Sequence, residues 1–226
     1  MILVIEGPSA VGKTTLCRAH SPNGFVEEAR ENQAAPDLYA DPAEVAQFWS
    51  NFNINLWQTA ERLERKNGIA VCDGDPFHFY FSWSLWKAGL LPSTLFEIEL
   101  PLYRRAFQEG RLGFADRVCW REAPEDELRR RAKSDPFRKR RRHETYLKLV
   151  PWMRTWFAIR EQVLPGTVRA WPDRLDHEVA GYPAAPAFRY DVKIFDQMID
   201  RLAAATAQTD SGTISAPAES FRSLPQ

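Results

Sequence analysis

Residues 7–14 read Gly7-Pro8-Ser9-Ala10-Val11-Gly12-Lys13-Thr14 and complete the pattern G-x-x-x-x-G-K-T of a phosphate-binding loop. The loop follows an apolar run at residues 1–5 and precedes a stretch that is compatible with a helix. In this arrangement a buried strand leads into a glycine-rich turn, whose backbone N–H groups face phosphate oxygens at the N-terminus of the next helix. We therefore predict that the loop binds the phosphates of a nucleoside triphosphate.

The loop also indicates which cofactors the chain uses. Lys13 is expected to reach the β- and γ-phosphates, and the hydroxyl group of Thr14 is expected to complete the coordination of Mg²⁺. We therefore predict ATP and Mg²⁺ as cofactors. The residues predicted to bind the nucleotide are Gly7, Ser9, Ala10, Val11, Gly12, Lys13, Thr14 and Thr15.

The composition is that of an ordinary globular protein. The chain has 226 residues, 44% of them hydrophobic, which is enough for one substantial core. Its formal net charge is zero, so the molecule as a whole is not biased toward nucleic acid or acidic membranes. The apolar run at residues 1–5 is too short to span a bilayer, and we expect a cytoplasmic protein. Cys17, Cys72 and Cys119 lie far apart and are interpreted as buried free thiols.

Strands and helices are expected to alternate along the chain. Asp41-Pro42 is typical of a helix start and Asn67-Gly68 of a helix end, so a long helix is predicted between them. Strands are predicted at residues 1–5, 25–26, 69–72, 117–120 and 167–170. This alternation predicts an α/β fold of the P-loop NTPase type, in which helices flank a mainly parallel sheet of about five strands in three layers.

One domain accounts for nearly the whole chain. We predict a catalytic domain over residues 1–205 that includes a lid at about residues 133–145. Residues 206–226 are rich in Ala, Thr, Ser, Gly and Pro, and this composition predicts a disordered tail.

Acidic side chains follow two of the predicted strands, at the sheet edge where ligands of such folds bind. Asp73 is predicted to hold Mg²⁺, directly or through water, or to contact the hydroxyl group of an acceptor; an aspartate that only starts a turn is the alternative. Either Glu27 or Glu28 is predicted to be the general base, although a pair of surface carboxylates is equally consistent with the sequence. The sequence does not decide which of these three carboxylates is the base.

The densest group of charges lies in residues 129–142, where only Asp135 interrupts the basic side chains with an acid. A solvated helix face usually interleaves acidic residues four positions apart, so this run indicates binding of an anion. We predict that two or three of its arginines contact the transferred phosphoryl group from a lid that begins at Asp135-Pro136.

Aromatic and amide side chains offer candidates for binding an acceptor. Core packing explains most of the aromatic residues in the segments 49–57 and 77–86. Some side chains in and near these segments are nevertheless predicted to stack on an acceptor or to form hydrogen bonds with it. The residues predicted to contact the acceptor are Asn53, Gln58, Asp75 and Phe77.

In this order, the features resemble those of P-loop kinases of small molecules, particularly the deoxynucleoside kinase and thymidylate kinase group. The shared features are GPSAVGKTT, the glutamates of FVEEA, a long helix with Asn and Gln, an acidic turn after the third strand, WREAPEDELRRR and DPFRKRRRHETYLKL. The resemblance covers roughly residues 1–205. It implies that Glu27 or Glu28 acts as the base, and that the transferred phosphate is contacted by Arg138, Arg140 and Arg141.

The chain departs from this group in its acidic turn. Nucleoside kinases usually have an acid-Arg-Ser triplet there, and nucleotide kinases an Asp-Arg-Tyr or similar triplet, whereas this chain has Asp73-Gly74-Asp75-Pro76. The missing arginine would help to hold the acceptor or its phosphate. P-loop phosphotransferases that modify antibiotics or other metabolites are also similar, so the acceptor stays unidentified at this point.

The function predicted from these observations is an ATP- and Mg²⁺-dependent transfer of the γ-phosphate to a hydroxyl group of a small acceptor, either nucleoside-like or a natural product. One alternative is an ATPase or switch module that acts through a protein partner. Another is a polynucleotide kinase, against which the neutral net charge argues. We expect a small-molecule acceptor as partner, with no membrane and no nucleic acid, and leave a homodimer open.

Overall fold

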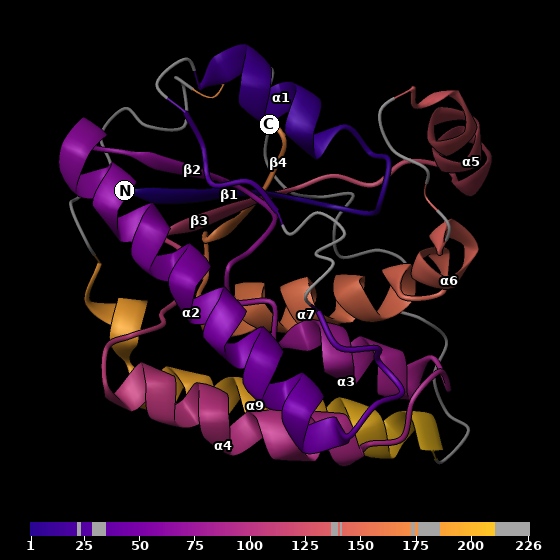
Figure 1. Ribbon diagram of the computed structural model, residues 1–226. Coiled ribbons are helices and arrows are strands. Elements are labelled where there is room, and N and C mark those ends of the chain that lie inside the picture. The colour runs from indigo at the N-terminus through magenta and orange to yellow at the C-terminus, as the bar shows by residue number, and fades with distance from the viewer. Residues whose placement is uncertain are drawn as a thin grey trace.

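A computed structural model describes residues 1–21, 24–28, 35–136, 140, 142–172, 175 and 186–210. Its centre is a parallel sheet with the strand order β2-β1-β3-β4 (Figure 1). The strands are β1 (Ile2–Glu6), β2 (Ala70–Asp73), β3 (Arg117–Trp120) and β4 (Val168–Ala170). Helices cover both faces, which confirms the predicted three-layer α/β fold.

Nine helical elements surround the sheet in the described residues. They are α1 (Lys13–His20), α2 (Pro42–Asn67), α3 (Tyr80–Lys87), α4 (Thr94–Gln108), α5 (Glu125–Ser134), α6 (His143–Leu147), α7 (Val150–Val163), the 3-10 helix η1 (Ala187–Tyr190) and α9 (Val192–Asp210). Among these helices, none is both long and apolar enough to cross a membrane.

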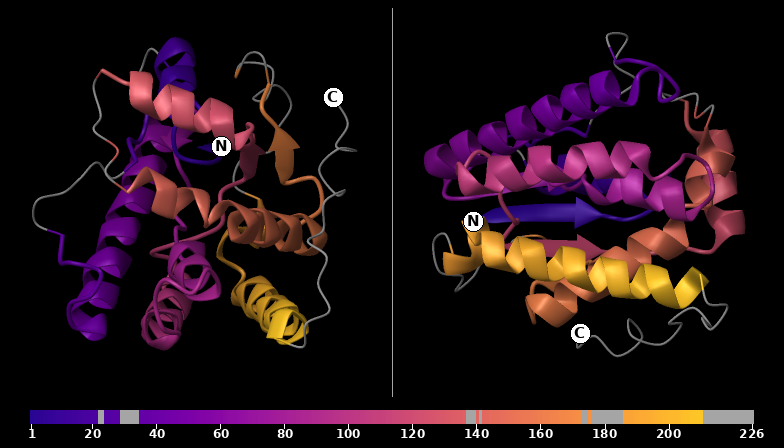
Figure 2. Two further views of the ribbon diagram at one scale, coloured as in Figure 1. Left: turned by 90° about the vertical axis from the view of Figure 1, so that its right-hand side faces the viewer. Right: turned by 90° about the horizontal axis from the view of Figure 1, so that it is seen from below.

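The side chains of β1 alternate between two hydrophobic cores, as expected for a strand covered on both faces. Leu3 and Ile5 pack in a smaller core with Cys17 of α1. Ile2 and Val4 point into a larger core that α2, α3, α4, α7 and α9 complete. Figure 1 and the two views of Figure 2 show α1 on one side of the sheet and α3, α4, α7 and α9 on the other.

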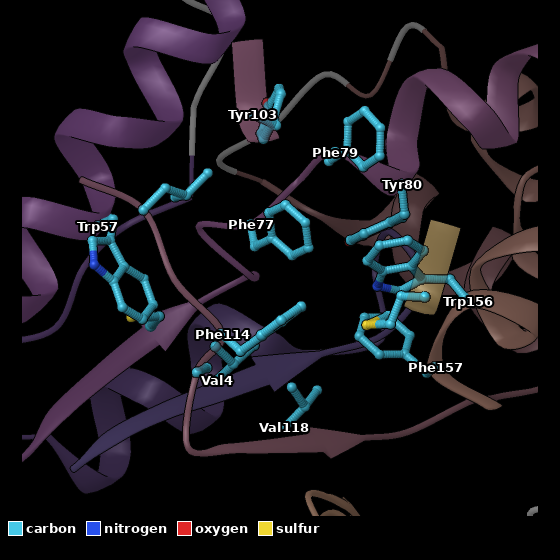
Figure 3. Packing of buried hydrophobic residues seen from close by; sticks show 14 of the residues in the cluster. Val4, Trp57, Phe77, Phe79, Tyr80, Tyr103, Phe114, Val118, Trp156 and Phe157 are labelled. Atoms are coloured by element: carbon cyan, nitrogen blue, oxygen red, sulfur yellow. The ribbon is translucent and has the colours of Figure 1, made fainter. Parts of the chain in front are cut away.

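The larger core is rich in aromatic side chains, and Phe77 lies at its centre (Figure 3). Its ring contacts the rings of Phe79, Tyr103, Phe107, Phe114, Trp156 and Phe195. Because Phe77 has no exposed surface, it offers no face to a ligand. The prediction that Phe77 contacts the acceptor is therefore wrong, and the residue is a core residue.

Both ends of α2 form where the sequence predicts them. The Asp41 carboxylate accepts hydrogen bonds from the backbone N–H groups of Ala43 at 2.8 Å and Glu44 at 3.2 Å, which satisfies donors that the first helical turn leaves unpaired. At the other end, Gly68 adopts a left-handed conformation with φ +78° and donates to the Glu64 carbonyl group at 2.7 Å.

One prediction about the strands needs correction. The strand predicted at residues 25–26 is an isolated parallel bridge between Val26 and Cys72, so the described residues contain four strands rather than about five. The helix α5, which carries the first part of the basic run, ends at Ser134, directly before Asp135-Pro136. A residue that precedes proline is disfavoured in helical conformation, and Asp135 is extended with ψ 108°.

Candidate functional site

The phosphate-binding loop joins β1 to α1 with an unusual backbone. Gly7 and Gly12 have φ angles of +151° and +110°, and Ala10, with φ +72°, also lies in the left-handed region. A side chain on Gly7 would collide with the carbonyl group of Arg121, so a residue without Cβ is required there. The strained conformation of Ala10 is typical of functional loops.

Lys13 lies beneath this loop among carboxylates. Its Nζ atom donates to the Gly7 carbonyl group at 2.9 Å and lies 3.7 Å from carboxylate oxygens of both Glu6 and Glu28. Burial lowers the pKa of Lys13, but Glu28, Glu6 and Asp73 outweigh this effect and hold the pKa above its usual value. The lysine is therefore cationic at the position where the phosphate loop begins.

Thr14 and Asp73 meet across the space between α1 and β2. The Thr14 hydroxyl group donates to a carboxylate oxygen of Asp73 at 2.5 Å. Hydroxyl and carboxylate oxygens are hard ligands of the kind that Mg²⁺ prefers when it is shared with substrate phosphates. This donor set fits Mg²⁺, because Thr14, in the first turn of α1, lines the cleft beside the phosphate loop.

The two adjacent glutamates after Val26 have different surroundings. Glu28 is half-buried, packs against Gly74 and lies beside Lys13, and it lines the central cleft. Glu27 is exposed and is not among the residues that line the cleft. The structure therefore favours Glu28 over Glu27 as the carboxylate that a bound acceptor would meet.

Two arginines of the basic run contact the loop. Arg131 donates to the Val11 carbonyl group at 2.7 Å, while Arg140 donates to the Ser9 hydroxyl group at 2.9 Å and to Asp135 at 2.9 Å. Arg138 and Arg141 lie outside the described residues. The sequence resemblance did not single out Arg131, although the residue belongs to the basic run that indicated an anion.

The loop opens into a cleft of about 2530 Å³ that extends to α2, α3 and α4. Of the residues predicted to bind the acceptor, Asn53 and Asp75 line the cleft, whereas the partly buried Gln58 does not. We call the part formed by α2, α3 and α4 the acceptor end. Its lining residues include Trp49, Phe52, Asn53, Leu56, Phe81, Ser82, Leu95, Glu99 and Tyr103.

A buried polar network fixes the acidic turn behind the cleft. Glu6 accepts hydrogen bonds from the Asp75 backbone N–H group and the Tyr80 hydroxyl group, both at 2.9 Å. The Asp75 carboxylate lies 3.3 Å from the guanidinium group of Arg160, which has no exposed surface. Burial raises the pKa of Asp75 to about 6, although Arg160 opposes the shift. The side chain of Asp75 is therefore tied to the protein core.

Glu6 and Trp171 were missed by sequence reasoning. The signal for Glu6 was an acidic residue at the end of an apolar strand, directly before Gly7. Trp171 follows β4 and donates from its indole Nε1 to the carbonyl groups of Glu6 at 3.0 Å and Cys119 at 2.8 Å. It thereby joins the carboxyl ends of β1 and β3. No pattern in the sequence around Trp171 predicts this contact.

No protein-family model matches the chain, and no curated protein sequence matches it. Solved structures do match. A deoxyadenosine kinase from M. mycoides with the products dCMP and a flexible dCDP bound shares 14% identity, with a TM-score of 0.55 over 92% of this chain and 100% of the other. A structure of deoxyadenosine kinase from M. mycoides with bound dATP shares 12% identity, with a TM-score of 0.51 over 76% and 90% of the two chains. At such identities the likeness shows the fold alone: the chain shares its α/β fold with these deoxyadenosine kinase structures.

Proposed function

We propose that this chain is an ATP- and Mg²⁺-dependent kinase that transfers the γ-phosphate to a hydroxyl group of a small nucleoside-like acceptor. The observation that carries the proposal is the meeting of Lys13, Glu28 and the pair Thr14–Asp73 at one end of a cleft whose other end is lined by apolar and amide side chains. The fold shared with a deoxyadenosine kinase supports a nucleoside-like acceptor over other metabolites.

Each group has a role in this reaction. The loop backbone and Lys13 hold the β- and γ-phosphates, and Arg131 and Arg140 stand at the loop where negative charge accumulates during transfer. Thr14 and Asp73 would hold Mg²⁺, which neutralises phosphate charge when bound. Residues 133–145 would close over the nucleotide as a lid, with Arg138 and Arg141 as further candidates for contacts to phosphate.

Glu28 completes the reaction as the base. The acceptor oxygen forms a bond to the γ-phosphorus, the bond from phosphorus to the β,γ-bridging oxygen breaks, and ADP leaves with that oxygen. The proton of the acceptor hydroxyl group passes to the Glu28 carboxylate. Because Lys13 is 3.7 Å from Glu28 in the described structure, phosphates that attract Lys13 would also free Glu28 for the acceptor.

The adjacent glutamates provide a matched test of this assignment. Glu28→Gln is expected to lower kcat by about 100-fold to 10,000-fold, because an amide cannot accept the proton. Glu27→Gln, on an exposed side chain, is expected to leave kcat within about twofold. Steady-state kinetics of both variants measure this difference, and equal losses in the two variants would contradict the role of Glu28.

The function itself is tested with the purified chain, ATP, Mg²⁺ and a panel of nucleosides, deoxynucleosides, their monophosphates and hydroxyl-bearing natural products. Mass spectrometry is expected to detect a phosphorylated product with at least one nucleoside-like acceptor, and none without Mg²⁺. Binding of ATP without any phosphorylated acceptor would overturn the proposal. Hydrolysis of ATP that depends on a protein partner would instead support a switch module.

A further inference from the structure

The acceptor end of the cleft contains a buried carboxyl group, that of Glu99 on α4. Its side chain lines the cleft, and the residue as a whole is only 4% exposed. It accepts a hydrogen bond from the Ser82 hydroxyl group, and no lysine, arginine or histidine of the described residues forms an ion pair with it. Burial raises the pKa of Glu99 to about 8 against this hydrogen bond. Burial thus favours the neutral carboxylic acid at this position.

The polar neighbours of Glu99 are uncharged, so they position its side chain without providing a counter-charge. Tyr103 lies one helical turn further along α4 and accepts a hydrogen bond from the Asn53 amide group of α2 at 2.5 Å. Burial raises the pKa of Tyr103 well above its usual value, and the nearby Glu99 raises it further. The hydroxyl group of Tyr103 therefore stays neutral. Ser82 of α3 and Asn53 of α2 do not titrate. Three helices therefore present polar groups within an apolar, aromatic wall.

We infer that Glu99, which lines the acceptor end of the cleft, selects the acceptor by pairing its carboxyl group with the edge of a planar nitrogen heterocycle that bears an amino group beside a ring nitrogen. This inference rests on the proposed function and names the acceptor class of the same site. A carboxylic acid offers an O–H donor and a carbonyl acceptor side by side. The heterocycle edge offers the matching ring nitrogen and N–H donor, while Ser82 occupies only one lone pair of the carbonyl oxygen.

Energetics favour such a ligand over a purely apolar one. A buried polar group that a ligand leaves unpaired costs the complex its hydrogen bonds to water, so a site built around such a group rejects analogues that lack the complementary edge. The aromatic and aliphatic lining residues Trp49, Phe52, Leu56 and Phe81 supply contact area for a flat ring. Glu99 and this apolar lining together select for a flat ring with one polar edge.

The test measures binding rather than turnover, so it is independent of phosphoryl transfer. Isothermal titration calorimetry compares 2′-deoxyadenosine, 2′-deoxycytidine, 2′-deoxyguanosine and thymidine on the wild type, Glu99→Gln, Glu99→Leu and Glu97→Gln. Glu97 is an exposed residue of the same helix and serves as the control. We expect the wild type to bind deoxyadenosine or deoxycytidine, Glu99→Gln and Glu97→Gln to bind within about threefold, and Glu99→Leu to bind about tenfold or more weakly.

The pH dependence separates a neutral carboxyl group from a carboxylate. Because the protonated form pairs with the ligand, wild-type affinity should fall about tenfold per pH unit above about pH 8, whereas Glu99→Gln should show no such fall. An analogue of the bound nucleoside that lacks the amino group should bind to the wild type and to Glu99→Leu with similar affinity.

Three results would overturn the inference. The first is a Glu99→Leu variant that binds the nucleoside as well as the wild type, and the second is a wild type that binds none of the four nucleosides. The third is a Glu99→Gln variant that binds the nucleoside as weakly as Glu99→Leu does, together with a wild-type affinity that rises with pH. This combination would mean that Glu99 pairs with a cation as a carboxylate. Phosphoryl transfer to another acceptor alongside any of these results would leave the kinase proposal standing. Binding as expected without transfer would refute the kinase proposal alone.

Discussion

Replacement of Lys13 by methionine is expected to lower the rate of phosphoryl transfer by about a thousandfold or more. Methionine keeps the length and apolar character of the lysine stem but removes the charge that lies at the phosphate loop. The Nζ atom of Lys13 is held at 2.9 Å from the Gly7 carbonyl group, and neighbouring carboxylates keep it protonated. Steady-state kinetics with ATP, Mg²⁺ and an acceptor found in the panel measure the loss.

The same substitution also affects stability, and a second variant separates the two effects. Lys13→Met leaves Glu28 without its cationic neighbour at 3.7 Å, so the variant should unfold at lower denaturant concentration than the wild type. Lys13→Met combined with Glu28→Gln should recover part of this stability, because the buried Glu6 still lacks its cationic neighbour, and none of the activity. Lys66→Met, on an exposed lysine at the end of α2, is the control for the substitution. Activity above a tenth of the wild-type value in Lys13→Met would rule out its proposed role.

Replacement of Arg160 by leucine is expected to have the largest effect on stability, a loss of about 3–5 kcal/mol in the free energy of unfolding. Arg160 has no exposed surface, and it donates to Asp75 at 3.3 Å and to the Ala115 carbonyl group at 2.5 Å. Leucine leaves the buried Asp75 without a counter-charge. For a chain of this size, the change should appear as a fall in Tm of about 2–4 °C per kcal/mol.

An exposed pair provides the matched control for Arg160. Arg104 and Asp196 form a two-pronged salt bridge between α4 and α9, but both side chains are about 40% exposed. Arg104→Leu should therefore cost about 1 kcal/mol or less. The double variant Arg160→Leu with Asp75→Asn should recover part of the lost stability, because it removes the unpaired charge. Equal losses in Arg160→Leu and Arg104→Leu would show that burial of the first pair has no energetic consequence.

The cost of Arg160→Leu should also depend on pH. Burial already raises the pKa of Asp75 above its value in an unfolded chain, and loss of the arginine raises this pKa further. A raised pKa in the folded state stabilises the protein below the unfolded-state pKa, near pH 4, and this stabilisation is lost as the pH rises. The difference in stability between wild type and variant should therefore be smallest near pH 4 and larger near pH 7.

The sequence predicted the elements whose signals are local. The phosphate loop and both ends of α2 depend on residues close to one another in the chain, as the Asp41 cap and the Gly68 turn show. Residues 117–120 are predicted as a strand and form β3. The strand predicted at residues 25–26 does not form, because Val26 pairs with Cys72 through a single isolated bridge. A short apolar stretch does not show how many backbone hydrogen bonds it will form with an adjacent strand.

Interactions between distant residues escaped prediction. The hydrogen bonds of Glu6 join residues 69 and 74 positions apart, and Arg160 is 85 positions from Asp75. Phe77 could not be recognised as a core residue, since aromatic residues recur throughout the segment from 77 to 86 and the sequence does not say which of them faces inward. Glu99 gave no sequence signal, because it resembles any helical surface glutamate until α2 and α3 cover it.

The alternation of side chains along β1 has a consequence for how such a protein can diversify. Leu3 and Ile5 belong to the core that carries α1 and the end of the phosphate loop, whereas Ile2 and Val4 belong to the core that carries α2, α3 and α4. In the proposed enzyme, substitutions in the larger core would reshape the acceptor end while the frame of the loop stays fixed. Changes confined to α2, α3 and α4, with Asp73 of β2 kept in place, are thus a direct route to altered specificity in the proposed enzyme, with a common apparatus for the nucleotide.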